Sequence, residues 1–344
     1  MSLLEVRRLT VRFGGLLAVN QLEFQIQPGT IVSVIGPNGA GKTTVFNAIT
    51  GIHPPTSGAL RFAGRDLRRP LRRPTVLALL AVGLLTAVGL VLLVDLEDLW
   101  QAVITDHYQY LQAFPWHTVA PSLASFFATD TVRRVVVPGL IGFVVGLAGA
   151  VAVWHRSRRA PEVAAQAGIA RTFQNIRLFK QMTALENVLI GLEQRSSTNL
   201  FHAATRLPPF HREQRRTVQE ATDLLRFVGL AAETASTADN LAYGHQRRLE
   251  IARALATRPQ LLLLDEPAAG LHPAEPAGLM ELIRQIRDRG ITVLLIEHHM
   301  KVVMGISDHI VVLDHGEKIA QGRPLDVSGN PKVIEAYLGK SEGH

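Results

Sequence analysis

The feature that most constrains this chain is the glycine-rich segment GPNGAGKT at residues 36–43. It follows the apolar run IVSVI, which is typical of a buried strand, and precedes residues 43–51, whose pattern is helical. Glycines let a backbone curl its N–H groups around a phosphate, and the start of the next helix adds its positive dipole end. The arrangement therefore predicts a nucleotide site in which Lys42 reaches the β- and γ-phosphates and Thr43 binds Mg²⁺. The candidate phosphate-binding residues are Gly36, Pro37, Asn38, Gly39, Ala40, Gly41, Lys42, Thr43 and Thr44.

A second apolar run, LLLLDEP at 261–267, ends in two acidic residues. Its four leucines place Asp265 at the carboxyl end of a buried strand, which is the edge where open α/β sheets bind ligands. Asp265 is predicted to hold Mg²⁺, directly or through water, and Glu266 to polarise the attacking water. The alternative is that Glu266 only starts a helix before Pro267, and the phosphate loop favours the catalytic role.

Hydrophobic periodicity predicts an α/β fold. Residues 1–30 alternate apolar with polar, which favours antiparallel strands, and 57–64 have the same alternation. Residues 214–230 have helical spacing, while 257–267 and 290–297 contain buried strands. Strands that alternate with helices indicate a mostly parallel sheet. The chain has no cysteine, which excludes a disulfide framework, a Cys-ligated zinc site and a thiol nucleophile.

Two runs of twenty uncharged residues, 75–94 and 135–154, interrupt this pattern. Each would form a helix about 30 Å long, the thickness of the hydrocarbon core of a bilayer. The 344 residues are 47% hydrophobic, which is high for a soluble protein. We therefore predict that a transmembrane hairpin at 68–159 is inserted into one domain, with its first part at 1–67 and its second at 160–344.

Charges flanking the runs predict their orientation. Five arginines precede the first run and three follow the second: Arg65, Arg68, Arg69, Arg72, Arg73, Arg156, Arg158 and Arg159. Between the runs lie five acidic residues and two arginines: Asp95, Glu97, Asp98, Asp106, Asp130, Arg133 and Arg134. The positive-inside rule places both outer ends in the cytoplasm and loop 95–134 outside, although Arg133 and Arg134 count against this.

The alternative to two membrane spans at 75–94 and 135–154 is a pair of buried core helices, which the absence of charge disfavours. Gly142 and Gly146, with Ala150 one turn on, would form a small-residue face for helix packing.

The net charge of the chain is +7, and its arginines cluster beside the apolar runs. The sequence shows no base-stacking module. We therefore expect contact with anionic lipids and no nucleic-acid binding.

Five stretches together resemble the ATP-binding subunits of ABC transporters. In the family's order they are GPNGAGKTT, RTFQ at 171–174, LAYGHQRRLEIARAL at 241–255, LLLLDEP, and LLIEHHM at 294–300. The branched-chain amino-acid importer type is the most similar, through VRFGGLLAVN, RTFQNIRLF, DEPAAGL, MGISDHI and VIEAYLG. The resemblance covers the chain outside the insertion. It implies a P-loop NTPase of ABC ATPase type, with a mixed sheet core, an antiparallel β subdomain and a helical subdomain at about 180–250.

The resemblance also implies roles for single residues. Phe13 is similar to the aromatic that stacks on adenine, with a strand core residue as the alternative. Gln174 resembles the Q-loop glutamine that contacts Mg²⁺ and senses the permease, and His298 resembles the switch histidine at the γ-phosphate. With Glu266, these two are the candidate catalytic residues. The signature motif, which in this family caps the nucleotide of the other protomer, falls on Leu241, Ala242, Tyr243, Gly244 and His245.

Three positions depart from the general family pattern. Ala242 stands where the signature has serine, as in branched-chain-type subunits. His245 replaces the signature glutamine, and His272 stands where Asp or Asn is usual. None of them falls at the predicted Mg²⁺ or water positions, so we expect ATP hydrolysis to be retained.

The family geometry implies that two subunits, identical or sister, close around two ATP molecules and reopen on hydrolysis. We expect this ATPase to power the import of branched-chain or related amino acids across the cytoplasmic membrane, with permease subunits and, indirectly, a solute-binding protein. The hairpin is expected to anchor the subunit and pack on the permease, or to act as a tether alone. Alternatives are a different solute such as urea or a lipid, and a non-transport or regulatory membrane-anchored ATPase.

Overall fold

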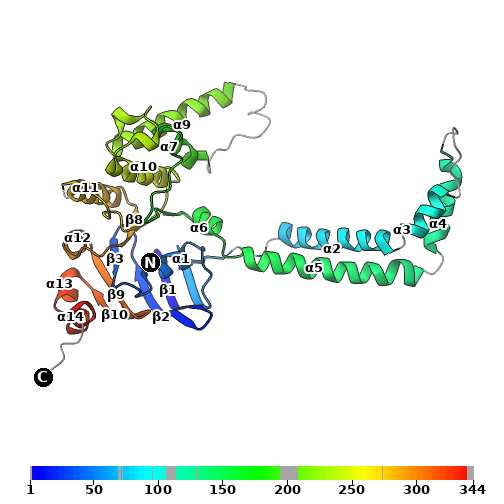
Figure 1. Ribbon diagram of the computed structural model, residues 1–344, viewed down its shortest axis with the longest axis horizontal. Helices are drawn as coiled ribbons and strands as arrows, with labels where there is room; N and C mark the ends of the chain where they lie inside the picture. Colours follow the sequence, from blue (N-terminus) through cyan, green and yellow to red (C-terminus); the bar gives the residue numbers. More distant parts are fainter. Residues whose placement is uncertain are drawn as a thin grey trace. The chain divides into compact units, whose positions relative to one another are not determined.

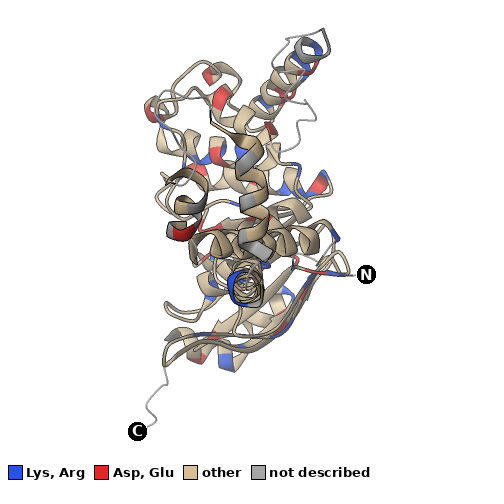
Figure 2. Ribbon diagram, turned by 90° about the vertical axis from the view of Figure 1, so that its right-hand side faces the viewer, with Lys and Arg blue, Asp and Glu red and all other residues tan. Residues whose placement is uncertain are grey.

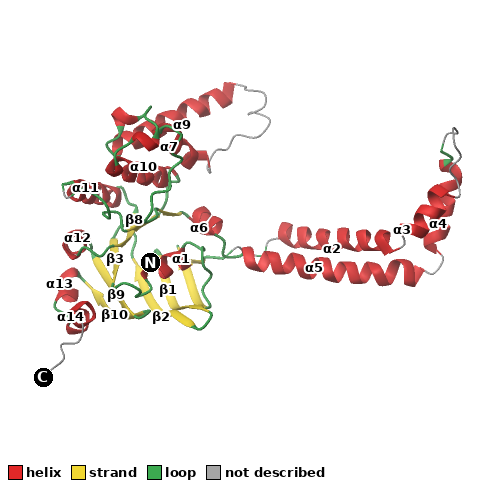
Figure 3. Ribbon diagram, in the orientation of Figure 1, coloured by secondary structure: helices red, strands yellow, loops and turns green. Residues whose placement is uncertain are grey.

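The computed structural model describes residues 2–68, 71, 73–94, 96–105, 114–128, 131–193, 208–272 and 274–338. The chain divides into two compact units, one made of Met1–Leu67 with Arg159–His344 and one of Arg68–Arg158. Figure 3 shows strands in the first unit and helices in the second. Several charged residues used above to orient the hairpin lie outside the described part: Arg69, Arg72, Asp95, Asp106 and Asp130.

An antiparallel sheet of four strands begins the first unit. Its order is β2-β1-β4-β5, with bounds β1 Leu4–Phe13, β2 Leu16–Ile26, β4 Ser57–Phe62 and β5 Arg65–Asp66. Leu4 and Val6 are buried on one side of a register shift, and Leu9 and Val11 on the other. Arg8, with φ 44°, lies at the shift, and the extra residue returns the later apolar side chains to the same face. The predicted alternation therefore corresponds to antiparallel strands.

A mixed sheet of six strands forms the centre of the first unit, in the order β10-β9-β3-β8-β7-β6. The strands are β3 Ile31–Ile35, β6 Ile169–Arg171, β7 Leu261–Asp265, β8 Thr292–Ile296, β9 His309–Asp314 and β10 Glu317–Gly322. All adjacent pairs are parallel except β9 with β10. Every residue of β3, β7 and β8 is buried, as expected for parallel strands covered on both faces. The predicted mixed sheet is confirmed.

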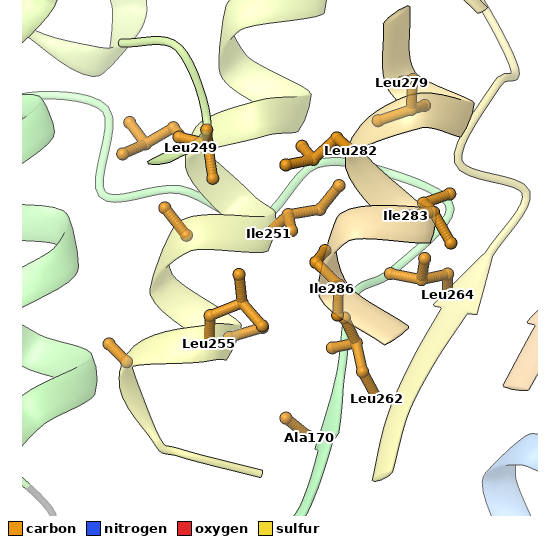
Figure 4. Close-up of a cluster of buried hydrophobic side chains, with 14 of the residues drawn as sticks. Ala170, Leu249, Ile251, Leu255, Leu262, Leu264, Leu279, Leu282, Ile283 and Ile286 are labelled. Atoms are coloured by element: carbon orange, nitrogen blue, oxygen red, sulfur yellow. The ribbon is translucent and has the colours of Figure 1, made fainter. Parts of the chain in front are cut away.

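Some helices of the first unit lie beside this sheet, and others form a group of their own beyond one end of it (Figure 1). Their bounds are α1 Lys42–Ile49, α6 Pro161–Ala167, α7 Ala184–Glu193, α9 Pro208–Phe227, α10 Tyr243–Ala256, α11 Glu275–Asp288, α12 Met300–Ile306, α13 Pro324–Ser328 and α14 Pro331–Leu338. Helices α7, α9 and α10 pack on one another. Leu262 and Leu264 of β7 share one buried cluster with apolar side chains of α10 and α11 (Figure 4). The strand that ends in Asp265 is thus fixed by its hydrophobic surroundings.

The second unit contains two long apolar helices, α2 (Arg73–Val94) and α5 (Val137–Ser157), which lie side by side (Figure 1). The hydroxyl of Thr86 donates to the carbonyl of Gly142 across the pair at 2.9 Å. A Cβ on Gly146 would overlap the Thr86 hydroxyl, so only glycine allows this close approach. The predicted small-residue contact of Gly142 and Gly146 is confirmed.

Most other side chains of α2 and α5 are exposed and apolar. Leu84 and Leu85 are 62% and 71% exposed, and Val145 and Val153 are 65% and 70% exposed. The helices Arg73–Val94 and Arg133–Ser157 are long and apolar enough to cross a membrane, by length and composition. The alternative of buried core helices does not describe them.

Residues 95–134 join the two long helices. Their described parts are mostly helical: α3 Leu96–Trp100, a π-helical turn at Gln101–Thr105, α4 Trp116–Ala128 and a second π-helical turn at Val132–Val136. Arg134 and Asp98 form an ion pair of 3.6 Å between the two ends of this segment.

Candidate functional site

The phosphate loop runs from the end of β3 to the start of α1, as the sequence predicted. A Cβ on Gly36 would overlap the carbonyl oxygen of Leu313, and a Cβ on Gly41 would lie 2.6 Å from the carbonyl oxygen of Ala18. Gly39 and Gly41 have φ angles of 82° and 94°, in the left-handed region that favours glycine. Neighbouring backbone and loop conformation together require glycine at these positions.

Lys42 is the first residue of α1 and is 8% exposed, and its side chain reaches back to the start of the loop. Its ammonium donates to the carbonyls of Gly36 and Pro37 at 2.8 and 2.9 Å. Burial lowers the pKa of Lys42, while the nearby Glu266 and Asp265 carboxylates oppose that shift. A buried ammonium whose hydrogen bonds go to neutral carbonyls is well placed to bind an anion.

Asp265 and Glu266 stand where β7 ends. The Asp265 side chain is 5% exposed, and its Oδ2 accepts from Arg171 Nη2 at 2.7 Å. Glu266 has φ 48°, a left-handed conformation that is strained for a residue with a side chain. Its N–H donates to the carbonyl of Ile296 at 2.9 Å, which holds it against β8.

Glu266 brings the three predicted catalytic residues together. Gln174 Nε2 donates to Glu266 Oε2 at 2.8 Å, and His298 Nδ1 lies 3.7 Å from Glu266 Oε1. Gln174 follows β6 and His298 follows β8, the two strands that flank β7. Because neighbouring parallel strands end at one edge of the sheet, residues about 30 to 90 positions apart converge there.

Sequence reasoning did not identify Glu297, which fixes the surroundings of the site. Its side chain is fully buried and accepts the backbone N–H groups of Ala268 and His298 at 3.0 and 3.1 Å. It thereby ties the loop after Glu266 to the loop that carries His298. A charged residue directly after a buried strand was the available signal.

A buried ion pair on α10, also missed, holds the Gln174 loop. Arg247 donates to the carbonyls of Phe173 and Gln174 at 2.7 and 2.8 Å and pairs with Glu250 at 3.0 Å. Glu250 in turn accepts the N–H groups of Phe173 and Arg177. Burial raises the pKa of Glu250, while Arg247 and the two N–H donors oppose the shift. Their i, i+3 spacing on a helix was the only sequence signal.

The signature residues form the start of α10. Ala242 precedes the helix and provides no side-chain cap, so the first N–H groups of the helix lack one. A Cβ on Gly244 would overlap the carboxylate of Glu275. Among the described residues, no hydrogen bond or ion pair joins 241–245 to the phosphate loop. One chain therefore does not bring these two predicted groups together.

Phe13 is the last residue of β1 and is 43% exposed, so the alternative of a core residue is wrong. Its ring contacts that of His53 edge-on, with centroids 5.3 Å apart.

Residues 19–85 and 141–269 match the ABC transporter family, and residues 317–343 match the branched-chain amino acid ATP-binding cassette transporter family. The first match leaves out residues 86–140, in the middle of the hairpin unit.

Curated relatives match almost the whole chain. The high-affinity branched-chain amino acid transport ATP-binding proteins BraF of Pseudomonas aeruginosa and LivG of Escherichia coli are each 37% identical over 340 residues, 98% of both chains. A solved ATP-binding cassette of an ABC transporter in its ADP conformation has a TM-score of 0.61 at 24% identity, covering 99% of this chain and 100% of that one. A dimeric post-hydrolysis cassette bound to ADP and phosphate has a TM-score of 0.57 at 18% identity, with coverage of 93% and 98%.

The chain therefore belongs to the ATP-binding proteins of ABC transporters and is an ATPase of that class. Within the class, its similarity is to the branched-chain amino acid transport proteins BraF and LivG.

Replacing Lys42 with alanine tests the phosphate loop. We expect Lys42→Ala to lose ATP hydrolysis and to weaken nucleotide binding at least tenfold, about 1.4 kcal/mol, because the charge aimed at the phosphates is gone. Binding of a fluorescent ATP analogue to the purified protein and the rate of phosphate release measure both. Lys318→Ala, which removes an exposed lysine on β10, serves as the matched control. Undiminished hydrolysis in Lys42→Ala would exclude the assigned site.

Proposed function

We propose that this protein is the ATP-hydrolysing subunit of an importer for branched-chain or related amino acids. The observation that carries the catalytic part is Glu266, held between Gln174 and His298 at the edge of the sheet where Lys42 also lies. The solute class is supported by the names of the relatives at 37% identity and by the match of residues 317–343.

The chain's own residues suit Mg²⁺–ATP. The hydroxyl of Thr43, the carboxylate of Asp265 and the amide oxygen of Gln174 are the hard oxygen ligands that Mg²⁺ prefers. Asp265 uses only Oδ2 toward Arg171, so Oδ1 stays available to the ion or to its water. Bound Mg²⁺ would neutralise charge on the phosphates. Thr43, Asp265 and Gln174 are therefore proposed to hold it.

Glu266 is proposed as the residue that polarises the attacking water. Its carboxylate already accepts from Gln174, so its position is set before substrate binds. His298 is half-exposed beside it and is proposed to contact the γ-phosphate, while Lys42 exchanges its carbonyl partners for phosphate oxygens. Phe13, exposed at the end of β1, is proposed to stack on adenine.

Two copies are proposed to complete each site. Leu241 to His245 lie at a helix start with no side-chain cap, and such a helix end attracts a phosphate through its N–H groups and dipole. Because one chain does not bring them to its own phosphate loop, we assign them to the nucleotide of a second ATPase subunit. Arg247, on the same helix, donates to the loop of Gln174, so a movement of α10 would shift Gln174 relative to Glu266.

A groove beside Gln174 is proposed as the contact with a permease subunit. It has a volume of about 1200 Å³ and lies between the Gln174 loop, α7 and α10, with Phe173, Phe179 and Arg253 among its lining residues. Arg247 joins this loop to α10, the helix that begins with the signature residues. A permease segment bound in the groove would therefore contact both the loop of Gln174 and the signature helix.

The hairpin unit is proposed to anchor the ATPase in the cytoplasmic membrane. Its exposed apolar faces suit lipid or permease helices, and its flanking arginines suit anionic headgroups on the cytoplasmic side. Residues 95–134 would then lie outside. The ion pair of Arg134 with Asp98 offsets one of the two arginines that count against this orientation.

Replacing Glu266 with glutamine tests the proposed dimer. We expect Glu266→Gln to hydrolyse ATP at least about 100-fold more slowly, because the group that polarises water is lost. It should keep ATP binding and accumulate as a closed dimer. Size-exclusion chromatography with light scattering, with and without ATP, measures this. Glu281→Gln, at an exposed position of α11, is the control. An ATP-bound Glu266→Gln that stays monomeric would count against sites shared between subunits.

Cysteine labelling tests the anchor, because the chain has no native cysteine. His117→Cys in α4 and Ser328→Cys in α13 both place the reporter at an exposed position. A membrane-impermeant maleimide on intact spheroplasts should label only His117→Cys, and both should react after lysis. If His117→Cys also needs lysis, residue 117 is not outside and the spanning hairpin is wrong, while the ATPase assignment is unaffected.

Uptake by whole cells tests the solute. Deletion of the gene should abolish high-affinity uptake of radiolabelled leucine, isoleucine or valine, and the wild-type chain, but not Glu266→Gln, should restore it. Loss of urea uptake with normal amino-acid uptake would show that the transported solute is urea and not an amino acid. Normal uptake of every solute tested would favour the non-transport ATPase.

A further inference from the structure

Arg171, the last residue of β6, joins three elements at the candidate Mg²⁺ site. Its Nη2 donates to Asp265 Oδ2 on β7 at 2.7 Å, and its Nη1 donates to Asn47 Oδ1 on α1 at 2.7 Å. A longer contact of 3.4 Å reaches the hydroxyl of Thr50. The Arg171 side chain is 6% exposed, and its guanidinium lies 5.5 and 5.2 Å from the rings of Phe46 and Phe173. Two hydrogen-bonded side chains and two flanking rings restrict its movement.

The two partners of Arg171 belong to the elements that carry the proposed metal ligands. Asn47 follows Thr43 by four residues on α1, so both lie on the same face of that helix. Asp265 ends β7. One guanidinium therefore bridges the helix of Thr43 to the carboxylate of Asp265. It contacts Oδ2 of Asp265, and among the described residues no hydrogen bond engages Oδ1.

We propose that Arg171 is a positioning residue that sets the affinity for the divalent cation by holding Asp265 in register with Thr43. This inference rests on the proposed function. Side chains that orient a metal ligand typically change metal affinity by about 10- to 100-fold when removed. Gln174 lies three residues further along the same segment and orients Glu266, so the end of β6 holds both carboxylates that end β7.

Two other roles for Arg171 predict different results. If it were only structural, its loss would lower the melting temperature and leave the cation requirement of the folded protein unchanged. If it competed with the cation for Asp265, its loss would lower the concentration of cation needed. The positioning role alone predicts a higher requirement.

The experiment uses the full chain and four variants: Arg171→Gln, Arg171→Lys, Asn47→Ala and Arg226→Gln. Electron paramagnetic resonance would measure Mn²⁺ binding to protein loaded with a non-hydrolysable ATP analogue, and phosphate release would give the Mg²⁺ concentration for half-maximal activity. Arg171→Gln should raise both concentrations about 10- to 100-fold. Binding of a fluorescent ATP analogue without metal should change by no more than about twofold, because Arg171 contacts no group of the phosphate loop among the described residues.

Asn47→Ala keeps the ion pair and removes only the link to α1, so it should raise the cation requirement less and keep the fold. Arg171→Lys keeps the charge but not the two-armed contact, and should fall between wild type and Arg171→Gln. Arg226→Gln is the matched control, since it removes an exposed arginine on α9. If Arg171→Gln fails to fold, Asn47→Ala and Arg171→Lys carry the test.

An unchanged or lowered cation requirement in folded variants would overturn the positioning role. The experiment distinguishes failure of the proposed function from failure of the role assigned to Arg171. If wild-type hydrolysis needs no divalent cation, or if Lys42→Ala hydrolyses normally, the proposed function itself fails. If wild type needs the cation and the variants do not shift that need, only the role of Arg171 is wrong.

Discussion

Burial of β7 is the constraint on which the rest of this site depends. All five of its residues are buried, Leu262 and Leu264 in a cluster with α10 and α11 and Leu261 and Leu263 in a cluster with α1. Yet the strand ends in a carboxylate and is followed by another. Two adjacent negative groups at the edge of a hydrophobic core need partners. Asp265 obtains Arg171, and Glu266 obtains Gln174, both from the end of β6. The same packing that stabilises the sheet therefore sets the position of the groups proposed for catalysis.

A second buried charge network extends this arrangement to the helical subdomain. Arg247 and Glu250 of α10 bind the backbone on both sides of Gln174. These bonds hold the loop and the helix together as one structural element. Removing either partner would leave an uncompensated charge in the interior, which is strongly destabilising. A helix that begins with the signature residues and a loop that lines a groove are thus physically coupled, as an ATPase that drives a transporter requires.

The hairpin unit follows different physics. Its two long helices contact each other through Gly142, Gly146 and Thr86 and expose leucine and valine elsewhere. Figure 2 shows basic and acidic residues interspersed over the elements of the first unit, as on an ordinary water-facing surface. The match to the ABC transporter family covers residues 19–85 and 141–269 and leaves out residues 86–140.

Local sequence determined much of this protein. The order of apolar run, glycine-rich loop and helix predicted the phosphate loop, and LLLLDEP placed two acidic residues at the end of a buried strand. The length and lack of charge of residues 75–94 and 135–154 predicted α2 and α5. These features are visible because each depends on residues that are neighbours in the chain.

Only the tertiary structure decided which charged and polar side chains meet. Arg171, Asn47 and Asp265 are far apart in sequence, and no spacing rule predicts that one guanidinium joins the other two. The convergence of Gln174 and His298 on Glu266 follows from strand order, since β6 and β8 flank β7, and strand order is not readable from any single segment. Sequence thus supplied the chemical groups, and the packing of parallel strands supplied their geometry.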